Sequence, residues 1–176
     1  MGIVTKKGDK GLTVLYRGAR IPKDSLRVEI LGTLDELSCF LGLSKCLLKN
    51  SSDKNLIALV QNDLFVIGTE IATASKQLRT LKKKIDKEAV RKIENNISFL
   101  ERKSVTKNTR FHLPGKNLAA SALDIARSIA RRAERRIISL KRKKMLRNDY
   151  ILQYLNRISD LVFLLACKYE HTHRGR

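Results

Sequence analysis

The sequence of 176 residues contains no tryptophan, only two prolines and nine glycines. This shortage of helix-breaking residues favours long helices over a fold rich in turns. Aromatic residues make up only 5% of the chain, and they do not alternate with basic residues as they do in proteins that stack single-stranded nucleic acids. No apolar run approaches the roughly 20 residues that a membrane-spanning helix needs. The hydrophobic content of 43% suffices for one core, so we expect a single folded domain over residues 1–176.

The chain also lacks the marks of targeting and metal binding. Its first residues contain neither the apolar stretch of a secretory signal nor the Arg- and Ser-rich lead of an organelle transit peptide, so we expect a cytoplasmic protein or a mature form. Cys39, Cys46 and Cys167 form no CxxC pair, and each lies in an apolar helical context. We predict that all three are buried free thiols. The three histidines are not at metal-ligand spacing with them, so we predict no metal site made by the protein.

Negative charge is scarce. The 37 lysines and arginines outnumber the 17 aspartates and glutamates, giving a net charge of +20. Such a surplus is typical of proteins with polyanionic partners. A nucleic-acid-binding helical domain is therefore one alternative function, although the lysines are scattered in small groups at 82–84 and 141–144. A helical interaction bundle without chemistry is a second alternative.

Apolar residues recur at three- and four-residue spacing in five segments. They predict amphipathic helices at about 26–48, 54–76, 86–103, 117–142 and 148–170. We interpret residues 51–53 as a turn and helix cap. The sequence shows no repeat and no strand pair, so we predict an all-α five-helix bundle that follows a long ordered N-terminal loop, residues 1–26.

That N-terminal loop is a weak candidate for anion binding. Gly8 and Gly11 permit positive φ, which lets consecutive backbone N–H groups converge on an anion, and neighbouring lysines add charge. The Walker A pattern GxxxxGK[ST] is absent. From its residues alone, the loop is either a phosphate-binding arm or a plain basic arm.

The fourth predicted helix carries the most unusual charge pattern. It holds five arginines between 127 and 136 but only one glutamate, Glu134. Arg127, Arg131 and Arg135 form a row at i, i+4 and i+8, where like charges repel. A guanidinium group matches the oxygens of carboxylates and phosphates. We therefore expect a polyanion, or carboxylates of another element or subunit, to balance this row; a solvated basic face is the alternative.

The remaining faces of this helix give further expectations. Arg132 and Arg136 border its apolar row, so we expect them to be partly shielded from water. Asp35 and Glu36 in the first predicted helix are either exposed, or one of them meets the arginines. The predicted apolar row consists of Leu118, Ala122, Ile125, Ile129, Ala133 and Ile137.

Four blocks of sequence together resemble one family. Residues 5–13 match its TxxGDxGxT phosphate loop, and residues 27–37 match RVExxGTxDEL. Residues 111–115, followed by 126–135, match FxLPG…AR…RRAER, and residues 154–160 match YLNRxSD. By these blocks the chain resembles the PduO-type ATP:corrinoid adenosyltransferases, also called cob(I)alamin adenosyltransferases.

The resemblance implies a five-helix bundle that assembles as a homotrimer with ATP between two subunits. It implies transfer of the 5′-deoxyadenosyl group of ATP to the cobalt of a reduced corrinoid, cob(I)alamin. The products are adenosylcobalamin and triphosphate, and Mg²⁺ takes part. A reductase and an adenosylcobalamin-dependent acceptor enzyme are the protein partners that it suggests.

The resemblance also assigns residues. It implies catalytic roles for Asp35 and Arg127, which would join adjacent subunits at the site, and for Phe111, which would pack under the corrin and keep a lower ligand off the cobalt. The sequence departs from the family pattern at Lys7, Lys116 and Asp124. The ATP-binding residues that the resemblance implies are Thr5, Lys6, Lys7, Gly8, Thr13, Lys23, Arg131, Arg132, Glu134, Arg135 and Asn156.

Overall fold

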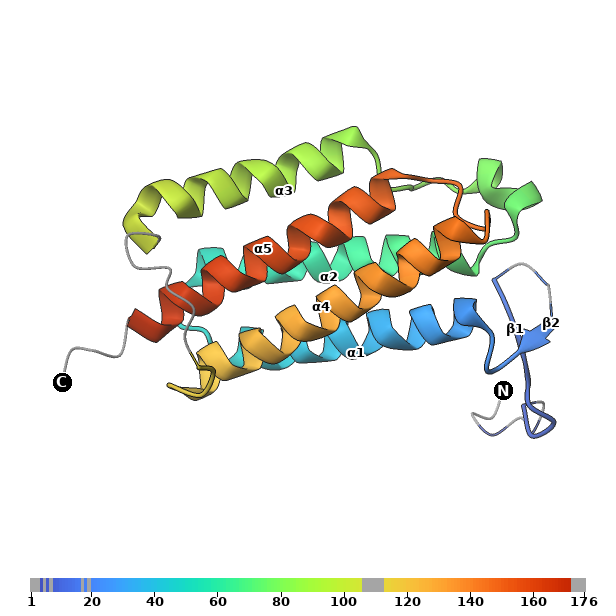
Figure 1. The fold of residues 1–176 in the computed structure, drawn as a ribbon, viewed down its shortest axis with the longest axis horizontal. Helices are drawn as coiled ribbons and strands as arrows, with labels where there is room; N and C mark the ends of the chain where they lie inside the picture. The colour runs from blue at the N-terminus through green and yellow to red at the C-terminus, as the bar shows by residue number, and fades with distance from the viewer. Residues whose placement is uncertain are drawn as a thin grey trace.

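The computed structural model describes residues 4, 6, 8–16, 18, 20–105 and 113–171. This part of the chain contains the helices α1 (Leu26–Leu47), α2 (Ser51–Ala72), α3 (Lys87–Leu100), α4 (Leu118–Arg142) and α5 (Tyr150–His171) (Figure 1). A 3₁₀ helix, η1 (Ser75–Thr80), follows α2, and a π-helical turn, η2 (Glu101–Val105), follows α3. The prediction of an all-α five-helix bundle is confirmed.

The prediction that the N-terminal segment contains no strands is wrong. Strands β1 (Leu12–Val14) and β2 (Arg20–Pro22) form an antiparallel hairpin in which Thr13 lies opposite Ile21. The hairpin lies at the end of the bundle where α1 begins (Figure 1). Because each strand has only three residues, its alternation is too short to be recognised in the sequence.

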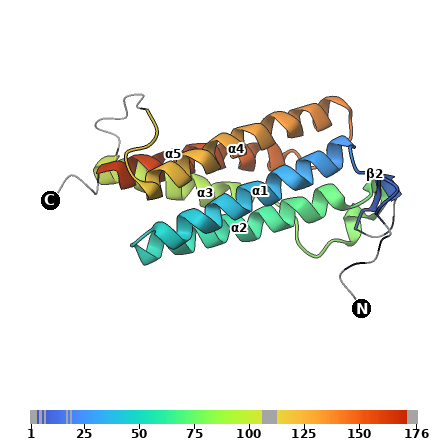
Figure 2. The same ribbon diagram turned by 90° about the horizontal axis from the view of Figure 1, so that it is seen from below.

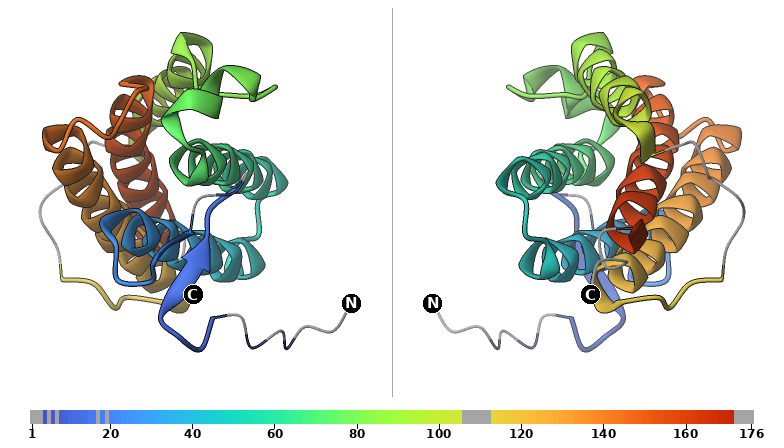
Figure 3. Two further views of the ribbon diagram at one scale, coloured as in Figure 1. Left: turned by 90° about the vertical axis from the view of Figure 1, so that its right-hand side faces the viewer. Right: turned by 90° about the vertical axis from the view of Figure 1, so that its left-hand side faces the viewer.

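Helix α4 occupies a central place in the bundle. It packs against α1 on one side and α5 on the other, while α2 packs beside α1 (Figures 1 and 2). Helix α3 packs against α5 and stands apart from α2 (Figure 3). The described part of the chain contains no helix that is both long and apolar enough to cross a membrane.

Burial between two neighbours changes which residues of α4 form the core. The alanines Ala126, Ala130 and Ala133 are fully buried and allow close helix approach. In contrast, Leu118 is 77% exposed and Ile125 is 44% exposed, so the predicted apolar row was wrong at these two positions. Packing on two sides buries a wider face of the helix than one row, which includes Leu123 as well as these alanines.

Two further local predictions need correction. Helix α2 begins at Ser51, directly after Asn50, whose side-chain Oδ1 accepts a hydrogen bond from Asp53 N at 3.1 Å. The segment 51–53 is therefore helical and not a turn. Cys167 is buried as predicted, but Cys39 and Cys46 are exposed, because both lie on a side of α1 that no described element covers.

Candidate functional site

The arginines of α4 are divided between its two neighbours. Arg132 and Arg136 face α1, whereas Arg131 lies toward α5, near Asp160. The division follows from helical spacing, because residues one position apart differ by about 100° around the axis. A single arginine-rich helix thus contributes positive charge to two sites.

On the α1 side, two ion pairs connect the helices. Arg132 pairs with Glu36, and Arg136 Nη2 lies 3.1 Å from Glu29 Oε1. The side chains of these four residues are 40–47% exposed, so water still reaches them and the pairs are weak. Carboxylates of another element therefore balance part of the arginine charge. Of Asp35 and Glu36, Glu36 is the residue that pairs with an arginine of α4. Arg132 is partly shielded as predicted, whereas Arg136 is exposed.

These ion pairs line an open pocket of about 540 Å³. Lys23, at the end of the hairpin, brings the N-terminal segment to this pocket. The pocket therefore combines charge from three separate parts of the chain. Its full lining is Lys23, Val28, Glu29, Gly32, Thr33, Glu36, Arg132 and Arg136.

Lys23 is also packed against the glycine-rich loop. Its backbone N–H donates to Gly11 O at 2.9 Å, and Gly11 has φ +73°. A Cβ atom at Gly8 would lie only 2.8 Å from Lys23 Nζ. A side chain at position 8 would therefore push the ammonium group away. Lys6 has φ 53° and is exposed, and Thr13 lies in β1. Thr5 and Lys7 lie outside the described residues.

On the α5 side, polar side chains form a continuous hydrogen-bonded chain. Asn156 Nδ2 donates to Glu134 Oε1 at 3.0 Å, and Arg157 donates to Asn156 Oδ1 at 2.7 Å and to Glu94 Oε1 at 2.9 Å. Burial raises the pKa of Asp160, while Arg157 and Arg131 lower it. The structure thus brings together Arg131, Glu134 and Asn156, three of the predicted site residues.

Arg131 and Arg135 differ from their neighbours because neither forms an ion pair with a described residue. Arg135 contributes with Arg132 and Glu36 to a second pocket of about 550 Å³, next to the first. Its other walls are largely apolar and include Pro114, Gly115, Phe40, Ile125 and Ile129. The exposed Ile125 therefore lines a pocket. The two adjacent pockets therefore suit a ligand, or a pair of ligands, with an anionic group at the first pocket and an apolar group at the second.

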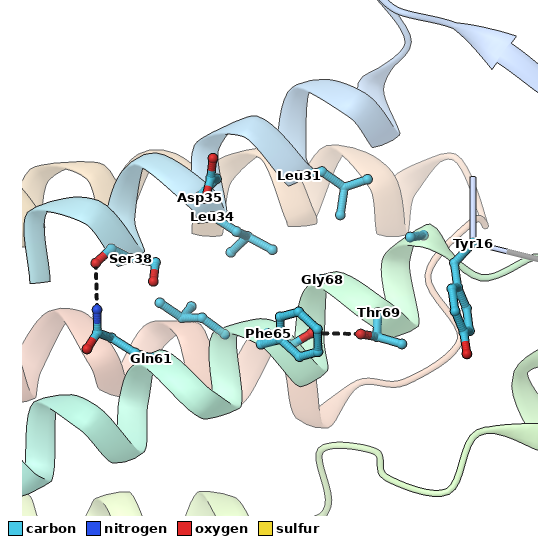
Figure 4. A pocket seen from close by; sticks show the side chains of 11 residues that line it. Tyr16, Leu31, Leu34, Asp35, Ser38, Gln61, Phe65, Gly68 and Thr69 are labelled. Atoms are coloured by element: carbon cyan, nitrogen blue, oxygen red, sulfur yellow. Dashed lines mark hydrogen bonds between the residues drawn. The ribbon is translucent and has the colours of Figure 1, made fainter. Parts of the chain in front are cut away.

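Asp35 and Arg127 do not meet within one chain. Arg127 Nε instead donates to Asp124 Oδ1 at 3.1 Å, and the Asp124 side chain is 6% exposed. Asp35 is exposed and lies on the edge of an apolar pocket of about 310 Å³ between α1 and α2 (Figure 4). It forms no ion pair with a described residue of its own chain. Phe111 lies outside the described residues.

Sequence reasoning missed two partners in this region. Glu29 was not considered, although Glu29 and Glu36 are seven residues apart on α1 and Arg132 and Arg136 are four apart on α4. Carboxylates on one predicted amphipathic helix and arginines on another were the available signal. Asp124 was noted only as a departure from a pattern. Lys116, the other such departure that is described, pairs with Glu170 at 3.0 Å.

The described residues contain no group of three or more His, Cys, Asp or Glu side chains that could hold a metal ion. The two pockets instead contain several cationic side chains that can donate hydrogen bonds to anions. Guanidinium groups, an ammonium group and a glycine-rich turn suit a ligand with several phosphate groups.

Comparison with known proteins identifies close relatives. The family model described as cobalamin adenosyltransferase matches residues 3–169. A corrinoid adenosyltransferase of Citrobacter freundii is 39% identical over 164 residues, which cover 93% of this chain and 92% of that protein. A corrinoid adenosyltransferase of Bacillus subtilis is also 39% identical, over 94% of this chain and 85% of that protein. The chain spans about half of a longer Citrobacter freundii relative, a PduO corrinoid adenosyltransferase, at 38% identity.

Solved structures agree with these matches. A variant of the PduO-type ATP:corrinoid adenosyltransferase from Lactobacillus reuteri, complexed with cobalamin and ATP, superimposes with a TM-score of 0.86 at 34% identity. The alignment covers 97% of this chain and 94% of that one. A second variant of the same enzyme, an arginine-to-lysine replacement complexed with ATP, gives a TM-score of 0.84.

Proposed function

Because the chain belongs to the cobalamin adenosyltransferase family, we propose that it transfers the 5′-deoxyadenosyl group of ATP to the cobalt of cob(I)alamin. The products are adenosylcobalamin and triphosphate. The observation that carries this proposal is the family match over residues 3–169, together with the pocket in which Lys23, Arg132 and Arg136 converge.

The reaction explains why the site is built from cations. The electron pair of Co(I) attacks the 5′ carbon of ATP, a cobalt–carbon bond forms, and the carbon–oxygen bond to the triphosphate breaks. Since the cobalt is itself the nucleophile, the protein needs no general base. Its tasks are to align the two substrates and to neutralise the charge that develops on the leaving triphosphate.

We assign the phosphates to the α1 side of α4. Arg132 and Lys23 bind the triphosphate there, and Glu36 releases Arg132 as the phosphate oxygens arrive. Gly8 keeps Lys23 close to the N-terminal loop. The residues that we expect to complete this part of the site are Thr5, Lys6, Lys7, Thr13 and Arg135.

We assign the nucleoside to the chain of polar groups on the α5 side. Asn156 and Glu134 are already hydrogen-bonded to each other, so their positions are fixed before a substrate arrives. Arg131 lies near Asp160 but forms no ion pair with a described residue, so its guanidinium group extends the phosphate site from this side. Conversion of Arg131 to alanine should abolish ATP binding, measured by calorimetry. A purely structural helical bundle would lose only stability.

We further propose that the protein is a homotrimer with its sites between subunits. Within one chain, Asp124 occupies only Arg127 Nε, so the two terminal nitrogens of Arg127 remain for Asp35 of a neighbouring subunit. Asp35→Asn should impair activity or trimer integrity, and reversing both charges together should partly restore them. Unchanged activity in Asp35→Asn would contradict this pairing.

The corrin is expected beside the apolar pocket of Pro114, Gly115, Ile125 and Ile129. We propose that Phe111 packs under the ring and excludes a lower ligand, which makes Co(II) easier to reduce. Phe111→Ala should therefore slow the route from cob(II)alamin far more than the route from cob(I)alamin. Equal losses would indicate a packing role only.

Mg²⁺ fits the site as a companion of ATP. The described residues offer no cluster of three acidic or imidazole ligands, so the phosphate oxygens and water would hold most of its coordination sphere. When bound, Mg²⁺ would neutralise part of the triphosphate charge. Lys23 and Arg132 neutralise the remainder.

The decisive assay supplies ATP, Mg²⁺ and chemically reduced cobalamin. It should yield light-sensitive adenosylcobalamin and one free triphosphate for each product. Absence of product at every protein concentration would refute the proposal. A nucleic-acid-binding function would instead give tight duplex or RNA binding with a steep salt dependence and no thermal stabilisation by Mg-ATP. A cytoplasmic location, a reductase and an acceptor enzyme remain predictions.

A further inference from the structure

The hydrogen-bonded chain on the α5 side joins three helices. It consists of Glu94 on α3, Arg157 and Asn156 on α5, and Glu134 on α4. Helix α5 carries the two middle members because it packs against both α3 and α4 (Figure 1). None of the residues assigned to ATP or to the corrin lies on α3. Glu94 is therefore the residue through which α3 is connected to the proposed nucleoside site.

The neighbours of Asn156 permit only one orientation of its amide. A carboxylate only accepts hydrogen bonds, whereas a guanidinium group only donates them. Glu134 Oε1 therefore takes the Nδ2 side of the amide, at 3.0 Å, and Arg157 Nη1 takes the Oδ1 side, at 2.7 Å. A flipped amide would place oxygen against the carboxylate and NH₂ against the guanidinium group. The two bonds leave one donor and one acceptor position of the amide for a ligand.

Arg157 is itself held from α3. Its Nε donates to Glu94 Oε1 at 2.9 Å while its Nη1 donates to Asn156, so one planar group bridges two acceptors. A lysine, with a single nitrogen on a flexible stem, does not reproduce this fork. The side chains of Arg157 and Glu94 are 37% and 44% exposed. The ion pair therefore contributes little stability, and its main effect is to fix where the guanidinium group points.

A second carboxylate explains why Arg157 needs this anchor. Asp160 lies one helical turn beyond Asn156 on α5, and the charge of Arg157 lowers its pKa, which burial raises. Asp160 is thus close enough to attract the same guanidinium group. Without Glu94, Arg157 would be free to turn toward Asp160 and release Asn156 Oδ1.

We propose that Arg157 and Glu94 are positioning residues for the nucleoside, which hold the Asn156 amide in the orientation that binds ATP. The inference rests on the proposed assignment of the nucleoside to Asn156 and Glu134, and it extends that site to α3. An amide that is ordered in advance need not be ordered when ATP arrives, which lowers the cost of binding.

Calorimetric titration of Mg-ATP into the full-length protein, without corrinoid, tests this role. Arg157→Met should weaken ATP binding about tenfold, because a hydrogen bond from a charged donor to Asn156 is lost. Arg157→Lys should remain within about threefold of Arg157→Met, because lysine restores the charge but not the fork. Wild-type affinity in Arg157→Lys would show that only the charge matters, and would overturn the proposal.

A double-mutant cycle separates positioning from direct contact. In an Asn156→Ala background, Arg157→Met should change the Kd for ATP by less than about twofold, because the amide that Arg157 orients is already absent. A full tenfold loss in that background would mean that Arg157 contacts ATP itself, and would contradict a positioning role. A pair that only joins α3 to α5 would lower the melting temperature of Arg157→Met and leave the Kd unchanged.

The role of Glu94 has a matched control on the same helix. Glu94→Gln should weaken ATP binding about two- to threefold, since a half-exposed pair is lost and Arg157 is only loosened. Glu88→Gln breaks the exposed pair with Arg91 and leaves the chain to Asn156 intact, so it should not change the Kd. Equal affinities for ATP in the two variants would refute the extension of the site to α3.

Asn156→Ala distinguishes failure of this inference from failure of the proposed function. Unchanged ATP binding in that variant would refute the nucleoside assignment and the positioning role with it. ATP binding that depends on Asn156 but not on Arg157 would refute the positioning role alone. A protein that binds ATP with the expected dependence on Arg157, yet forms no adenosylcobalamin, would support the positioning role and refute the proposed function.

Discussion

Two sets of charged residues in this molecule are built in opposite ways. At one end of the bundle, Asp53 is 4% exposed and accepts hydrogen bonds from Lys168 Nζ at 2.7 Å and Tyr169 OH at 2.8 Å. Burial, followed by the bond to Asp53, raises the pKa of Tyr169 to about 12. Between α1 and α4, in contrast, Arg132–Glu36 and Arg136–Glu29 are almost half exposed.

This difference distinguishes charged residues that stabilise the fold from charged residues that are available to bind a ligand. A buried charge that loses its partner is costly, so the Asp53 cluster cannot be altered without weakening the fold. Exposed pairs contribute about 0–1 kcal/mol, so the arginines of α4 can exchange partners at little cost. The exposed pairs are therefore the ones that can accept a substrate.

Among variants that compare these two sets of charged residues, Arg132→Ala has the largest expected effect. If Arg132 stabilises the leaving triphosphate as we propose, losing its guanidinium group should lower kcat/KM for ATP by about 100-fold or more. The free energy of unfolding should change by less than about 1 kcal/mol, because the pair with Glu36 is solvated. Steady-state kinetics and urea denaturation measure the two quantities. Arg142→Ala, at the exposed end of α4, is the control and should affect neither.

Asp53→Ala should produce the reverse pattern. Removing one partner of a fully buried pair costs about 3–5 kcal/mol, and the 28% exposure of Lys168 reduces our expectation to about 2–3 kcal/mol of unfolding free energy. Adenosyl transfer per folded molecule should be unchanged. Glu88→Ala, which breaks the exposed pair with Arg91, should cost less than about 0.5 kcal/mol. Equal losses in the two variants would contradict the distinction drawn above.

Gly8→Ala should have a smaller effect, confined to substrate binding. The new methyl group meets Lys23 Nζ, and displacing a single ammonium group should raise KM for ATP about three- to tenfold without loss of stability. In a Lys23→Met background the same substitution should change KM little, because the displaced group is already gone. An undiminished effect there would mean that Gly8 acts through its backbone.

The smallest effect is a pH dependence at Glu70. Burial raises the pKa of this carboxyl, and its hydrogen bonds to Asn148 and Ile85 only partly oppose that shift. The folded state therefore binds more protons than the unfolded state between the unfolded carboxyl pKa of about 4.3 and the raised folded value, so this group's contribution to stability falls as pH rises through that window. The stability deficit of Glu70→Gln relative to wild type, from urea denaturation at several pH values, should shrink as pH rises. A deficit that grows with pH would contradict a raised pKa of Glu70 in the folded state.

The sequence was sufficient for the helices and for part of the ion pairing of α4. Long apolar periodicities located five helices, and the excess of arginines predicted anionic partners, which for Arg132 and Arg136 are carboxylates of α1. The sequence did not predict the features that depend on tertiary contacts. Whether Cys39 is covered depends on which side of α1 meets another helix, and whether Ile125 is buried depends on α4 having two neighbours. The separation of Asp35 from Arg127 within one chain follows from the folded arrangement, and no spacing in the sequence reveals it.

The glutamates of α1 also protect the site from small ions. Glu29 and Glu36 are carboxylates tethered beside Arg136 and Arg132, and tethering gives them an effective local concentration in the millimolar range or above. Chloride or a single phosphate must compete with this internal anion one contact at a time. A molecule with several linked phosphate groups would compete at several cations together, so we expect the pocket to prefer chains of phosphates to simple salts.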